Sequence, residues 1–168
     1  MRIAAGIILI IAAIINVVGG AAYVLGGGVT AAVGKGVEMV ADEAAKEGAV
    51  DSAAAEATKA EVSKATSAGL GVMIFGLFLW VMFVLQIVGA VFLFISKSKM
   101  FIFVVAGLSI VAEIVGMILS SSILETGGGF GWTNLFGLVG GVLAFLGAMA
   151  IGKAAAPAAP AAPAAPQG

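Results

Sequence analysis

Four long stretches with almost no charge constrain this chain more than any other feature of its sequence. A bilayer core about 30 Å thick needs about 20 apolar residues in a helix that rises about 1.5 Å per residue. Each stretch is close to that length or longer and is apolar on all sides, and only the third carries a charge, at Glu113. We therefore predict an all-α fold, an integral membrane four-helix (tetraspan) bundle, with helices at about 3–26, 70–95, 101–124 and 135–152.

The composition excludes several classes of protein. The chain has 168 residues, of which 62% are hydrophobic and 10% charged, whereas about a quarter of an ordinary soluble domain is charged. So few charged side chains cannot cover a globule, which excludes a free-standing soluble enzyme. The net charge of −1 argues against a nucleic-acid partner. The sequence contains no cysteine and no histidine, which removes disulfides, the usual zinc sites and His-based catalysis. We expect no cofactor, no metal and no enzymatic activity.

The polar residues are concentrated between the first two apolar stretches. Residues 35–68 hold four lysines and seven of the nine acids, and their Ala, Glu and Lys content favours helix. We predict two short helices at about 37–47 and 52–66, separated at Gly48, the second able to continue into the membrane helix at Leu70. This polar helical loop is either a solvated hairpin or a docking surface for a partner's ectodomain.

The remaining residues suggest the domain limits and the orientation. Residues 1–152 form the transmembrane domain and 153–168 a flexible Ala/Pro-rich tail, a spacer or a ligand for a proline-binding module. Both termini are expected in the cytoplasm, because the short turn with Lys97 and Lys99 is purely basic. Residues 1–22 could instead be a cleaved signal peptide, but the uncharged run continues beyond them, which favours a retained helix.

Glu113 is the residue that most needs a partner. A charged side chain at mid-membrane costs about 2.5–3.5 kcal/mol even on the lenient insertion scale, so we expect this one to face the bundle interior. At about 1.5 Å per residue, Asn16 and Glu113 lie about 18–20 Å deep, and Gln86 and Ser109 about 12–13.5 Å deep. We predict that these four residues form one polar layer that fixes helix register, with Glu113 donating to Asn16 and Gln86 bonding Ser109. The alternative is a proton or cation site at Glu113.

Small residues recur every three or four positions and allow helix backbones to approach closely. They pack helices within one bundle or also against a second copy. Aromatic residues near the outer boundary are candidate interface anchors. The packing ridges are Gly137, Gly140, Gly141, Ala144, Ala148 and Gly152 on the last helix and Ala112, Gly116 and Ser120 on the third, and the anchors are Tyr23, Phe130 and Trp132.

A long outer loop, a tight basic turn and a short second outer loop resemble the plan of small tetraspan membrane proteins such as claudins and tetraspanins. The resemblance is one of topology alone, because the cysteines of their outer loops are absent here. We expect a structural or accessory subunit of a membrane complex, acting through lateral helix packing and its outer helical loop. Its partners would be the lipid bilayer and other membrane-protein subunits or further copies. The alternative function is a proton- or cation-conducting or transporting oligomer centred on Glu113.

Overall fold

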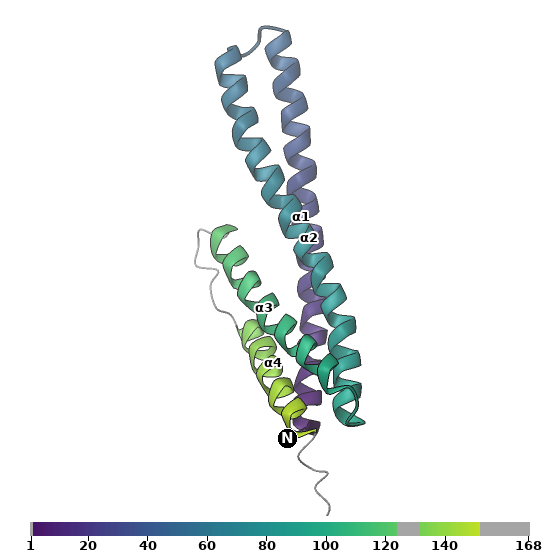
Figure 1. Cartoon of the computed structure of the whole chain (residues 1–168). Coiled ribbons are helices and arrows are strands. Elements are labelled where there is room, and N and C mark those ends of the chain that lie inside the picture. The colour runs from purple at the N-terminus through teal and green to yellow at the C-terminus, as the bar shows by residue number, and fades with distance from the viewer. Residues whose placement is uncertain (1, 124–131, 152–168) are drawn as a thin grey trace, which may run out of the picture.

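The computed structural model describes residues 2–123 and 132–151, and the regular structure in these two ranges is entirely helical (Figure 1). Three of the helices described are long and apolar enough to cross a membrane, and the last is a shorter apolar helix. This architecture supports the all-helical membrane class. The helices are α1 (Arg2–Lys46), α2 (Ser52–Phe94), α3 (Lys99–Ile123) and α4 (Trp132–Ala150).

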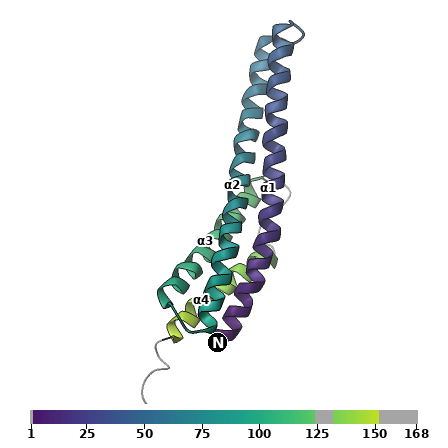
Figure 2. The same ribbon diagram turned by 90° about the vertical axis from the view of Figure 1, so that its right-hand side faces the viewer.

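α1 and α2 form an antiparallel hairpin that is much longer than a membrane is thick. At 45 and 43 residues, the two helices measure about 68 and 64 Å, more than twice the hydrocarbon core of a bilayer. α3 and α4 lie beside one half of the hairpin, and the other half projects beyond them (Figures 1 and 2). If the lower half spans the lipid, the projecting half must therefore lie outside it.

The expected break between residues 26 and 37 is absent, because α1 continues through it. Glycines spaced by seven, at positions 20, 27 and 34, are buried on the side of α1 that faces α2. A methyl group on Gly27 would collide with the backbone at Gly69, and one on Gly69 would lie 2.9 Å from the Gly27 carbonyl oxygen. Tertiary packing of backbone against backbone thus outweighs the low helix propensity of glycine, about 1 kcal/mol per residue.

The hairpin turns sharply at Gly48, whose φ of +70° is favoured by the missing side chain. The Ala49 N–H donates to the Ala44 carbonyl at 3.0 Å and the Gly48 N–H to the Ala45 carbonyl at 3.3 Å, which closes α1 with a Schellman motif. The Asp51 carboxylate then accepts from the N–H of Ala53 and caps α2.

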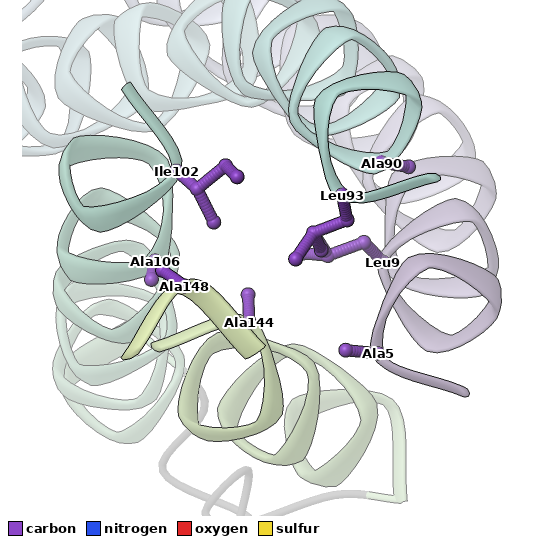
Figure 3. Packing of buried hydrophobic residues seen from close by; sticks show 8 residues of the cluster. All are labelled: Ala5, Leu9, Ala90, Leu93, Ile102, Ala106, Ala144 and Ala148. Atoms are coloured by element: carbon purple, nitrogen blue, oxygen red, sulfur yellow. The ribbon is translucent and has the colours of Figure 1, made fainter. Parts of the chain in front are cut away.

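Two apolar clusters hold the bundle together. The first lies near Arg2 and the α2–α3 turn, and the side chains of Leu9, Leu93 and Ile102 converge there (Figure 3). Alanines complete it and allow the helices to approach closely. The second lies farther along the bundle, and polar side chains are buried between the two. The first cluster comprises Ala5, Leu9, Ala90, Leu93, Ile102, Ala106, Ala144 and Ala148, and the second Phe75, Leu79, Met82 and Ala112.

Candidate functional site

A buried amide on α2 links three helices. The Gln86 side-chain oxygen accepts from Asn16 Nδ2 of α1 at 2.9 Å, and its nitrogen donates to Ser109 Oγ of α3 at 3.0 Å. All three side chains are buried, Gln86 and Ser109 to within 1% of full burial. Because both ends of the Gln86 amide are bonded, burying it leaves neither its donor nor its acceptor unsatisfied.

A second polar contact joins α3 to α4. Asn134 Nδ2, in the first turn of α4, donates to Glu113 Oε2 at 2.9 Å. Glu113 is 9% exposed and lies one helical turn beyond Ser109 on α3. The two contacts together therefore connect all four helices at one level of the bundle, and we call these five residues the polar layer.

The Glu113 carboxyl group fits against α4 because position 137 is glycine. A Cβ atom on Gly137 would collide with the Oε1, Cδ and Cγ atoms of Glu113. A Cβ on Gly116 of α3 would meet the Phe75 ring at 3.4 Å and Asn134 Nδ2 at 3.9 Å. Gly137, expected from the sequence to be a packing ridge, thus also makes room for the acid.

The layer brings together the four residues that the depth argument grouped, with different pairings. The Gln86–Ser109 hydrogen bond is present, but Asn16 bonds Gln86 and Glu113 bonds Asn134, so the expected Asn16–Glu113 pair is wrong. The reason is the order of the helices, since α1 contacts α2 and α4 and lies across the bundle from α3. The depth of a residue depends only on its distance along its own helix, so depth alone does not indicate which helices are neighbours.

Asn134 was missed because it was assigned to the loop before a helix expected to begin at residue 135. The helix instead begins at Trp132, three residues earlier. The sequence did contain a signal for it. Asn134 carries an amide side chain and directly precedes the uncharged run that begins at residue 135, so it could have been considered as a partner for Glu113. Polar side chains at the edge of a membrane helix hydrogen-bond across to neighbouring helices.

The small-residue ridges are filled within this chain. Gly140 faces Ile8 and Ala12 of α1, whereas Gly141 faces Ala106 and Ile110 of α3. Since α1 and α3 already cover these faces, they are not open to a second copy. The other ridge residues that the structure describes in full, Ala112, Gly116, Gly137, Ala144 and Ala148, are also buried.

One of the three candidate interface anchors can be placed. Tyr23 is half-buried and packs edge to face on Phe75, with ring centroids 5.4 Å apart. Its role as an anchor stays a prediction. Phe130 and Gly152 lie outside the described residues, and for Trp132 and Ser120 only the helical backbone is described.

Within residues 2–123 and 132–151, no group of three or more His, Cys, Asp or Glu side chains could hold a metal ion. The polar layer is suited to joining helices, since amide and hydroxyl groups make up most of it. Comparisons of the chain with protein-family models, curated proteins and solved structures found no match.

Proposed function

We propose that this chain is a non-enzymatic four-span membrane protein, with both termini in the cytoplasm, that acts as a structural or accessory subunit of a membrane complex. The bundle anchors it, and the projecting half of the α1–α2 hairpin, residues 25–70, is the docking element. We call this half the stalk. The observation that carries the proposal is the distribution of apolar side chains in the stalk.

The stalk buries small side chains and exposes large apolar ones, which is the reverse of the usual distribution. Its buried residues are all small, and none is larger than threonine, whereas its large apolar side chains are exposed except for Val62, which is half-buried. Val29 is 63% exposed and Val40 68%. The buried residues are Gly27, Ala31, Gly34, Ala55, Thr66 and Gly69, and the exposed large apolar residues are Leu25, Val29, Val33, Val37, Met39, Val40, Val50 and Leu70.

This distribution is unfavourable for a hairpin that stands alone in water. Full burial of a valine or leucine side chain contributes about 1.5–3 kcal/mol, and the stalk leaves most of that contribution unused. α3 and α4 do not extend along the stalk to cover these side chains (Figure 2). Exposed apolar patches of this kind mark protein or membrane interaction sites. A docking role follows, because contact with another subunit would bury them.

A photo-crosslinking residue on the stalk tests this role. A crosslinker at Val29 should give a stoichiometric protein adduct in native membranes. The matched control is Val84, which is similarly exposed, at 55%, but lies on the half of α2 beside α3 and α4, and should react with lipid. If Val29 also reacts with lipid alone, the stalk is not a docking element.

Four spans require α4 to cross the membrane. At 19 residues it measures about 28 Å, close to the thickness of the hydrocarbon core, and it packs between α1 and α3. An even number of spans puts both termini on one side. Protease protection of tags at the two ends should therefore give the same result for both, and opposite results would mean three spans.

A proton- or cation-conducting oligomer is the second candidate, favoured by the burial of Glu113 between α3 and α4. Glu113→Gln separates the two, because a glutamine can still accept from Asn134 but cannot carry a proton. Under the structural proposal, liposomes containing the intact chain show no flux above empty liposomes. A flux that Glu113→Gln abolishes would favour the conducting oligomer.

A further inference from the structure

We propose that the stalk docks on a second copy of this chain, with α1 against α1 in a parallel, two-fold symmetric pair. This inference rests on the proposed function and names its partner. It is carried by one continuous face of α1, the arrangement of glycines around that helix, and the charges on the neighbouring face of α2.

The face of α1 that would form the pair is a straight apolar stripe. Its residues are three or four positions apart, which places them on one side of a helix. From Val18 to Val40 it runs about 33 Å, starting beside the bundle and continuing along the stalk. We call it the α1 stripe: Val18, Ala22, Leu25, Val29, Val33, Gly36 and Val40, of which all but the half-buried Gly36 are exposed.

From Val18 to Gly36 the stripe lies opposite the face that contacts α2, whereas Val40 borders a pocket that Ala55 and Thr58 of α2 also line. Gly20, Gly27 and Gly34, on the inner face, are packed against α2 so closely that each would collide with it if it carried a Cβ. Gly36 on the stripe and Gly26 at its edge have nothing within 4 Å of the Cβ position. α1 therefore has glycines on two faces, one row closed by α2 and the other open to the close approach of another helix.

A second copy meets this face in a way that other partners need not. Two copies inserted with the same orientation are related by an axis along the membrane normal, so each stripe residue meets its equivalent at the same depth. Because the stripe carries no charge, the pair buries none. Contact between two copies also buries both exposed stripes at once and leaves neither free for a third copy. Another partner would have to supply its own uncharged helix of matching length and depth.

The charges of the stalk point to α1 rather than α2 as the contact helix. On the α2 side of the stalk, the exposed residues include Glu61 and Lys64, whose charges would be desolvated in a close helix contact. On α1, the acids beyond the stripe are Asp42, which pairs with Lys59 of α2, and Glu43, whose side chain is 69% exposed. The two Glu43 carboxylates of a pair would therefore stay in water.

Single cysteines test the pair directly, since the native chain has none. Val29→Cys, Gly36→Cys and Val40→Cys should each form an intermolecular disulfide in membranes under mild oxidation. Ser67→Cys is the matched control, being exposed at a similar height on α2, and should stay reduced. In mild detergent the native chain should sediment as a dimer. Val33→Glu should be monomeric, while Ala68→Glu, an equal change of charge on α2, should stay dimeric.

The outcomes separate this inference from the proposed function. Disulfides at the stripe but not at Ser67→Cys, with loss of the dimer in Val33→Glu alone, support both. If the chain is a monomer and the Val29 crosslinker reacts only with a different protein, the pair is overturned but the docking role is kept. If the crosslinker reacts only with another segment of its own chain, the pair is overturned and the docking role is not supported. Equal crosslinking at all four cysteines means random collision and overturns the pair. Lipid adducts alone overturn both proposals.

Discussion

The carboxyl group of Glu113 on α3 occupies the space that a side chain at Gly137 on α4 would fill. The acid and the glycine are therefore a matched pair, since the burial of one depends on the absence of a side chain at the other. Asn134, three residues earlier on α4, supplies the hydrogen bond that holds the carboxyl group in this position. α3 and α4 are thus joined by both shape and polarity at one level.

Gly137→Ala should destabilise the bundle. The added methyl group collides with Glu113, and overpacking of this kind typically costs about 1–3 kcal/mol. The measurement is the free energy of unfolding in mixed micelles with increasing SDS. Gly107→Ala is the control, because nothing lies within 4 Å of its Cβ position and alanine favours the helix. Equal stability of the two variants would mean that Glu113 does not pack against α4.

Gln86→Leu should cost more stability than Ser109→Ala. The first removes both hydrogen bonds of the amide and leaves Asn16 and Ser109 buried without it, at about 1–3 kcal/mol per unsatisfied group. The second removes one bond, which inside membranes averages about 0.6 kcal/mol. The same SDS titration measures both. A leucine variant as stable as the native chain would show that the amide does not bridge the three helices.

Gly69→Ala should destabilise the hairpin, whereas Gly71→Ala should not. A methyl group at position 69 would lie 2.9 Å from the Gly27 carbonyl oxygen and push α1 and α2 apart, whereas position 71 has open space. We expect a loss of about 1–3 kcal/mol for the first and no loss for the second. Spin–spin distances between labels at Ala32 and Ser67 would show the separation, and unchanged distances in Gly69→Ala would contradict close backbone packing.

Lys59 should stabilise the tip of the stalk over a wide pH range. Its ammonium group pairs with Asp42 and, at 3.1 Å, with Glu56. The hydrogen bond from Lys59 and its charge lower the pKa of Asp42 from 3.8, and the bonds to both acids raise the pKa of Lys59 from 10.5. The contribution of Asp42 is present above pH 3.8 and lost as the pH falls through the lowered pKa. That of Lys59 is present below pH 10.5 and lost above the raised pKa.

Lys59→Gln should therefore accelerate hydrogen exchange in residues 42–59 at pH 7 and leave the polar layer unchanged. The difference should shrink in about 1 M salt, which screens exposed charges. Lys46→Gln is the control, because Lys46 is 74% exposed and its ion pair with Glu43 is long, at 4.0 Å. Equal effects of the two variants would show that the ion pairs with Lys59 do not order the tip.

Periodicity and the absence of charge were enough to predict an all-helical membrane chain. The same signals failed between residues 26 and 37, because the membrane helix was predicted to end at about 26 and the next helix to begin at about 37. Gly27 and Gly34 are helical because they pack on Gly69 and Thr66, residues that lie more than 30 positions away in the sequence. Helix propensity describes only local preference and cannot anticipate such contacts.

In the polar layer, too, the sequence predicted which residues take part but not which of them bond to each other. Depth along each helix grouped Asn16, Gln86, Ser109 and Glu113, because depth follows from residue number alone. Which side chains bond each other depends on the order of helices around the bundle, which depth does not contain. Asn134 completes the layer only because α4 begins at Trp132, and helix boundaries are the least certain part of any sequence-based assignment.

Both proposals require the α1–α2 hairpin to leave the membrane midway along its length. Spin labels on exposed positions of α2 can establish where it does so, with Ala68 on the stalk and Val84 beside the bundle. At Ala68 a water-soluble nickel complex should relax the label more strongly than oxygen, and at Val84 oxygen should dominate. Dominance of oxygen at both positions would place the stalk in the lipid, where it could not dock as an element outside the membrane.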